Sequence, residues 1–219
     1  MAQAASRDLW LRTGAATSAM TPHSRRPEAV IRLLSLAAVL LFVIQSPAAA
    51  QELRIDEFRF GGTWTNPSWI ENDHAEADDA GITAEVLTAP VDFASRFGVE
   101  NPILAAILTP RFHVGGTGVL DEDGTSYVYA GLTWHQALGD ILFIESSFGG
   151  SLNNGNTNGA PGRAKIGSNV LFREAFAIGA NLTDTMTLVT QIEHMSHAGL
   201  AASDNRGLTH VSVKLGLRF

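Results

Sequence analysis

The closing stretch GLTHVSVKLGLRF, residues 207–219, alternates apolar and polar side chains along its whole length. Because successive side chains of a strand point to opposite faces, one face carries the apolar set and the other the polar set. The apolar set is Val211, Val213, Leu215, Leu217 and Phe219. A strand of a soluble sandwich can alternate in the same way. An aromatic residue directly after such a strand is typical of outer-membrane barrels, so Phe219 favours a membrane barrel.

The rest of the chain after Gln51 has the same character. It contains no sustained helical stripe, and segments of about ten residues alternate in polarity between clusters of turn residues. Together these predict an all-β fold, an eight-stranded antiparallel transmembrane β-barrel whose small lumen is filled by side chains. The expected strands are 53–63, 81–90, 103–114, 125–135, 139–149, 166–179, 185–197 and 207–219.

An even number of strands with a periplasmic start places the loops after the first, third, fifth and seventh strands outside the cell. The connection 91–102 is long for a periplasmic turn, and we expect a short helix near Phe93 to Phe97 there. Three tryptophans fit the aromatic belts at the membrane interfaces: Trp64, Trp69 and Trp134.

The first fifty residues have the layout of an export signal. Arg25, Arg26 and Arg32 precede the apolar run 33–44, and Ala48-Ala49-Ala50 offers a small-residue cleavage site before Gln51. A run of this length is short for a spanning helix, which needs about 20 residues. We therefore expect a signal peptide over 1–50 and a barrel over 51–219; a retained anchor is the alternative.

The composition limits the classes of partner and of metal site that the chain can have. The formal net charge of −7 argues against nucleic acid, which needs a basic face. With no cysteine, neither a disulfide nor a thiolate metal site is available. We expect no metal and no cofactor, and an exported acidic chain located in the cell outer membrane.

The segment 185–197 carries the candidate chemistry. Its even positions are mostly apolar and end in His194 and Ser196, so this pair is expected on the lipid-facing wall at the extracellular end. A histidine beside a serine can take the hydroxyl proton as the oxygen attacks a carbonyl. The plainer interpretation is a pair of interfacial polar residues. His194 and His197 face opposite ways, which disfavours a shared metal.

Several stretches in the second half of the chain resemble a known family. His194-Met195-Ser196-His197-Ala198-Gly199-Leu200, with the following Asn205-Arg206-Gly207-Leu208, resembles the lipid A 3-O-deacylase (PagL), or acyloxyacyl hydrolase, family. Residues 167–174 resemble that family's sixth strand. The resemblance implies an outer-membrane esterase that removes the 3-O-linked hydroxyacyl chain from lipid A of lipopolysaccharide, at a site facing membrane lipid.

Carried over position by position, the resemblance implies Ser196 as nucleophile and His194 as base. Asn205 would help to hold the oxyanion, with a backbone N–H near Gly199 as a second donor. Thr209 stands where the family has its triad glutamate, and Asp204 is a candidate substitute. The alternative is a non-catalytic structural or ligand-binding outer-membrane barrel. The oligomeric state is left open, with a homodimer among the options.

Overall fold

The computed structural model describes residues 53–67, 79–122, 124–158, 166–201 and 206–219. The predicted signal peptide lies outside these residues, as do Trp69, Asp204 and Asn205.

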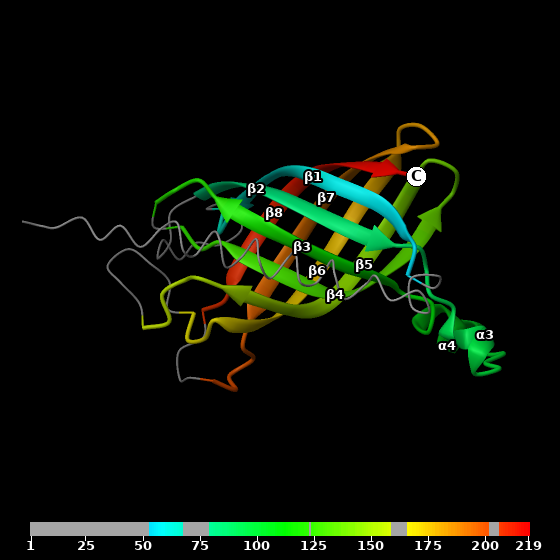
Figure 1. The fold of residues 1–219 in the computed structure, drawn as a ribbon, viewed down its shortest axis with the longest axis horizontal. Helices are drawn as coiled ribbons and strands as arrows, with labels where there is room; N and C mark the ends of the chain where they lie inside the picture. The colour runs from blue at the N-terminus through cyan, green and yellow to red at the C-terminus, as the bar shows by residue number, and fades with distance from the viewer. Residues whose placement is uncertain (1–52, 68–78, 123, 159–165, 202–205) are drawn as a thin grey trace, which may run out of the picture. The chain divides into compact units, whose positions relative to one another are not determined.

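Eight antiparallel strands form a closed barrel (Figure 1). Each strand pairs with the next, and β1 also pairs with β8, so the sheet has no free edge. The predicted all-β barrel is confirmed. The strands are β1 (Ile55–Thr65), β2 (Asp79–Thr88), β3 (Arg111–Val119), β4 (Tyr127–Leu138), β5 (Leu142–Asn153), β6 (Val170–Asn181), β7 (Met186–Ser196) and β8 (Leu208–Arg218).

The two faces of the wall are inverted relative to a soluble protein. Charged side chains such as Arg59 and Glu145 are buried inside, whereas large apolar ones such as Ile82, Phe176 and Ile178 are exposed outside. An apolar outer band is what lipid requires of a spanning strand. The protein is therefore an outer-membrane barrel by its surface as well as by its topology.

Ion pairs and hydrogen bonds fill the lumen. Arg59 donates to Glu57 at 2.9 Å and to Glu145 at 2.6 Å, and Arg111 donates to Glu57 at 2.9 Å. Nearer the other end, Glu193 accepts from Arg173 and from the Tyr127 hydroxyl. Because buried charges need partners, the inward faces of facing strands are matched in charge. The barrel interior is a packed polar core.

The third strand was predicted wrongly at both limits. It was expected at 103–114, but residues 102–107 are helical and the strand runs from Arg111 to Val119. The expected strand ended before Gly115, yet Gly115 and Gly116 lie within the observed one. A Cβ at Gly115 would come within 2.5 Å of the Tyr129 ring, so glycine here makes room for an inward aromatic side chain.

The fifth and sixth strands are also displaced toward higher numbers. Gly149 was expected to end the fifth strand, but it pairs with Gly131 well inside the sheet. A Cβ at either position would come within 2.3 Å of a backbone carbonyl oxygen on the neighbouring strand. These glycines therefore permit close approach of β4 and β5, and the strand continues through them to Asn153.

The two ends of the barrel differ in their connections. The turns 139–141 and 182–185 are short and lie at the same end as the start of β1 and the end of β8. Short turns mark the periplasmic end. The exception at this end is the connection from β2 to β3, which holds α3 (Phe93–Arg96) and α4 (Pro102–Ile107), confirming the expected short helix (Figure 1). No helix among the described residues is long and apolar enough to cross a membrane.

Candidate active site

The alternation along β7 places His194 and Ser196 on the outer wall. The outward residues Leu188 and Ile192 are each 41% exposed, and His194 and Ser196 continue their row as half-buried side chains. Between the two, Met195 points inward and is fully buried. The pair lies at the end of β7 remote from the short turns, which is the extracellular end.

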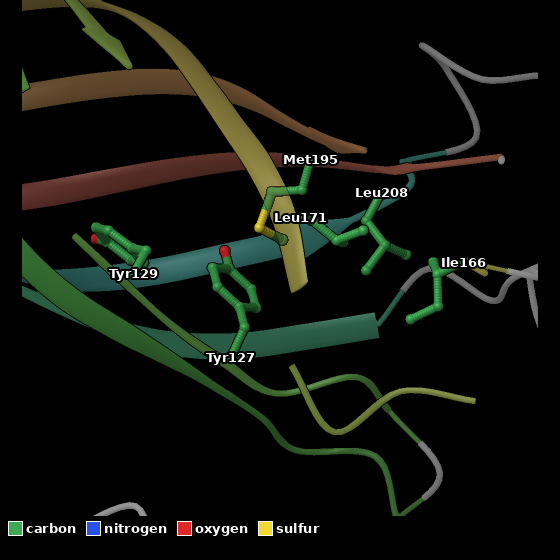
Figure 2. Packing of buried hydrophobic residues seen from close by; sticks show 6 residues of the cluster. All are labelled: Tyr127, Tyr129, Ile166, Leu171, Met195 and Leu208. Atoms are coloured by element: carbon green, nitrogen blue, oxygen red, sulfur yellow. The ribbon is translucent and has the colours of Figure 1, made fainter. Parts of the chain in front are cut away.

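An apolar cluster inside the barrel determines which residues of β7 face outward. Met195 packs there with Tyr127 and Tyr129 on β4 and with Leu208 on β8 (Figure 2). A slip of β7 by one residue would turn Met195 out and bring His194 and Ser196 into the lumen. Burial of Met195 therefore holds the two polar side chains toward lipid.

Thr209 engages the imidazole from the neighbouring strand. It lies directly opposite His194 on β8, and its hydroxyl is 3.1 Å from His194 Nδ1. A ring nitrogen held in this way leaves Nε2 as the nitrogen for proton exchange with a substrate or nucleophile. Thr209 can orient the ring but brings no charge to it.

Asn66 in turn clamps the backbone of Thr209. Its side-chain Oδ1 accepts from Thr209 N at 2.8 Å, and its own N–H donates to the Thr209 carbonyl at 2.6 Å. Asn66 has a φ of +44°, in the left-handed region that asparagine tolerates better than most residues. The end of β1 is thereby tied to the residue that orients His194.

Gly207 forms the floor beneath the ring. Its φ is +68°, and a Cβ there would lie 2.6 Å from Cε1 and 2.8 Å from Nε2 of His194. Any side chain would displace the imidazole. Neither Gly207 nor Asn66 was recognised from the sequence as part of the site, because their contacts cross strands.

Ser196 lies opposite Phe172 on β6. Within the described residues its hydroxyl makes no hydrogen bond, so the structure places serine and histidine on one face without joining them. Residues i and i+2 of a strand are about 7 Å apart along the backbone. Such catalytic contacts often tighten only when substrate is bound.

The chain turns sharply directly after Ser196. Ala198 and Gly199 have φ values of +51° and +76°, and Leu200 N donates to His197 O at 2.9 Å. His197 is buried, and its Nδ1 accepts from Ala201 N at 3.3 Å. Gly199 is thus held within three residues of the serine, whereas Asn205 lies outside the described residues.

An apolar groove of about 480 Å³ adjoins the serine. It runs over β5 and β6, and its walls include Phe148, Phe172 and Leu200. The rings of Phe148 and Phe172 stack with centroids 6.3 Å apart. The groove is open to the membrane side of the wall and suits a hydrocarbon chain.

A carboxylate that the sequence did not single out shares this face. Glu174 on β6 is directly opposite His194 in register and is exposed. It stands in an outward row with Phe172 and Phe176, where an acidic group is unfavourable in lipid. The signal that could have found it is the strand alternation of 170–181 combined with the pairing to β7.

Comparisons with known proteins agree with this fold. The family model described as lipid A 3-O-deacylase (PagL) matches residues 116–218. The crystal structure of the outer membrane enzyme PagL superimposes with a TM-score of 0.53 at 14% identity, covering 74% of this chain and 99% of that one. The N-terminal barrel domain of Pseudomonas aeruginosa OprF gives a TM-score of 0.46 at 9% identity, covering 75% and 98%.

A designed transmembrane β-barrel gives a TM-score of 0.46 at 7% identity, covering 75% of this chain and 95% of that one. No curated protein sequence matches the chain. The matched span runs from within β3 to the end of β8 and includes His194, Ser196, Gly207 and Thr209. Over residues 116–218 this outer-membrane β-barrel is similar to the lipid A 3-O-deacylase (PagL) family, and its fold is similar to that of PagL.

Proposed function

We propose that the protein is an outer-membrane esterase that removes the 3-O-linked hydroxyacyl chain from lipid A. The observation that carries the proposal is the joint placement of His194 and Ser196 on the membrane-facing wall, with Thr209 bonded to the ring. A substrate that resides in the outer leaflet can reach this face without leaving the bilayer. The family match over 116–218 supports the same chemistry.

In the proposed reaction, Ser196 Oγ attacks the ester carbonyl carbon while His194 accepts the hydroxyl proton. The sugar 3-oxygen leaves with that proton, and a water molecule, deprotonated by His194, then hydrolyses the acyl-serine to release a 3-hydroxy fatty acid. Asn205 and a backbone N–H near Gly199 are proposed to stabilise the oxyanion of each step. The groove at Phe148 and Phe172 is proposed to hold the departing acyl chain.

The residue that orients the His194 ring is a threonine and not the acid of a usual triad. Thr209 fixes the ring, and we propose that Glu174 supplies the negative charge from the opposite side of β7. Removing the acid of a triad can cost ~10⁴ in rate. We therefore expect a slow enzyme whose imidazolium is stabilised through space.

Mass spectrometry of lipid A tests the proposal. Cells that express the wild-type protein should show lipid A lighter by one hydroxyacyl chain, and Ser196→Ala should abolish the loss. Thr190→Ala is the matched control, because it removes another outward hydroxyl from the same strand. Identical spectra with and without the wild-type protein would contradict the proposal.

The second candidate function is a non-catalytic barrel. The uncharged Thr209 at the triad position and the unbonded Ser196 hydroxyl within the described residues favour it. If Thr209→Glu is correctly folded yet inert toward lipid A, this second function gains support.

A further inference from the structure

The connection from β2 to β3 exposes more apolar surface than a periplasmic turn needs. Phe97 is 72% exposed and Ile103 71%, and Leu104 and Ile107 are each 52% exposed. The stretch 93–107 contains only two charged residues, Arg96 and Glu100. In water such a patch would be a liability for aggregation.

Helix caps and a backbone hydrogen bond give this connection a defined structure. Asp92 caps α3 through its bond from Ser95 N at 2.9 Å, and Asn101 caps α4 by accepting from Ile103 N and Leu104 N. Phe93 N donates to Leu108 O at 3.0 Å, which ties the start of α3 to the end of α4. The exposed apolar side chains are therefore presented on a defined pair of short helices.

Both helices contact outward side chains of the barrel wall. Phe93 packs edge-on against Phe112 of β3, with ring centroids 6.5 Å apart. Trp134 of β4 donates from Nε1 to the carbonyl of Ile107 at 2.8 Å. Trp134 lies on β4 directly after the last residue that pairs with β3, toward the periplasmic end, and tryptophans near the ends of a barrel mark the membrane interface. The helices therefore lie at the level of the periplasmic interface, on the lipid side of the wall.

A crevice of about 1000 Å³ separates α4 from the wall. Ile103, Ala106 and Ile107 line it from the helix, and Ile144 and Phe176 line it from the outer wall. It lies where β4 runs past the start of β3: the last pair is Arg111 with Thr133, and β4 continues to Leu138. At its polar end Asp56 and Arg218 are half-buried, whereas Arg111 and Glu145 are buried in ion pairs with Glu57 and Arg59.

We propose that α3 and α4 form an anchor in the phospholipid of the inner leaflet, with one acyl chain in the crevice. The exposed apolar side chains continue the lipid-contacting wall without a break at Phe112 and Trp134. The apolar sides of the crevice match a fatty acyl chain, and its mixed-charge end matches a zwitterionic headgroup such as phosphatidylethanolamine. The end of the barrel remote from His194 faces the leaflet that holds such lipid.

Single-cysteine spin labels test this anchor, because the native chain contains no cysteine. The labelled variants are Phe97→Cys, Ile103→Cys and Ala106→Cys, in full mature barrels reconstituted into phosphatidylethanolamine and phosphatidylglycerol vesicles. Ile178→Cys, on the exposed outer wall, is the lipid control, and Asp140→Cys, in an exposed short turn, is the aqueous control. Heat-modifiable mobility on gels confirms that each variant is folded.

Relaxation by oxygen, which concentrates in hydrocarbon, is compared with relaxation by a water-soluble nickel chelate. We expect positions 97, 103 and 106 to favour oxygen as position 178 does, and position 140 to favour nickel. Nickel access at 97 and 103 equal to that at 140 would overturn the anchor. Nickel access at 106 alone would overturn the acyl chain in the crevice. No part of this test depends on ester hydrolysis.

Discussion

Gly207 and the imidazole of His194 are so close that any side chain at position 207 would collide with the ring. A Cβ there would lie 2.6 Å from Cε1 of the ring, and the backbone has a φ of +68°. The ring is thus confined between a backbone floor and the Thr209 hydroxyl. Proton transfer depends on such confinement, because a misplacement of 1 Å can cost about 10²-fold in rate.

Gly207→Ala should therefore lower kcat by about 10- to 100-fold while the barrel stays folded. Gly139→Ala is the matched control: its φ is +93°, yet a Cβ there meets nothing within 4 Å. It shares the backbone strain without the steric conflict. The measurement is release of hydroxy fatty acid from purified lipid A. Equal activity of the two variants would show that the floor beneath His194 does not matter.

Replacing Thr209 separates orientation from charge. Thr209→Val removes the bond to Nδ1 and should lower kcat by about fivefold, since a lost hydrogen bond costs on the order of 1 kcal/mol. Thr209→Glu adds the missing charge and should raise kcat above wild type. Steady-state kinetics on detergent-dispersed lipid A distinguish these effects. An unchanged kcat with Thr209→Val would contradict the orienting role, and a decrease with Thr209→Glu would contradict the benefit of the added charge.

Glu174→Gln should lower kcat with little change in KM, because a charge that stabilises the imidazolium acts in the transition state. Glu174→Asp should keep part of the activity. Asp140→Asn, an exposed acidic position in a short turn at the other end of the barrel, should leave kinetics unchanged. If the kcat of Glu174→Gln equals that of the wild type, Glu174 does not stabilise the imidazolium and Thr209 is the residue that acts on the His194 ring.

Glu193→Ala should destabilise the barrel by about 3–5 kcal/mol, because it leaves Arg173 buried without its carboxylate. Tyr127 and Gln191 lose their acceptor as well. Urea unfolding followed by tryptophan fluorescence measures the change, with the exposed Glu100→Ala as control. An unfolding midpoint shared by both variants would show that the lumen network contributes little.

The mature chain should begin at Gln51. Intact mass measurement of protein purified from outer membranes checks this directly, and Ala50→Leu should impair processing because cleavage needs small residues there. A mass that retains residues 1–50 would show a membrane anchor instead of a signal peptide.

Much of the barrel was predictable because a spanning strand must satisfy lipid on one face. The alternation of 207–219 and 185–197 gave β8 and β7 nearly to the residue, and it placed His194 and Ser196 outward. The third strand was missed because Ile103 and Leu104 look like strand residues locally. The Asn101 cap and Pro102 at the start of their helix are local signals that the strand interpretation overlooked, whereas the bond from Trp134 to the Ile107 carbonyl is a contact that a local pattern does not contain.

The surroundings of the site were less predictable for the same physical reason. Gly207 was expected at the start of the last strand, but its contact with His194 follows from the pairing of β7 with β8. Asn66 comes to the site from directly after β1, far away in the chain, and Glu174 comes from β6, the strand that pairs with β7. A single sequence shows which face a residue occupies, whereas the neighbour across the strand depends on the closed register.

The central claim is that Ser196 attacks an acyl ester of lipid A from the lipid-facing wall. The most direct measurement is hydroxy fatty acid released from lipid A by purified wild-type and Ser196→Ala barrels in the same detergent. The account predicts one released acyl chain per lipid A with the wild type and none with Ser196→Ala. Equal release by both proteins, or no release by a folded wild type, would contradict it.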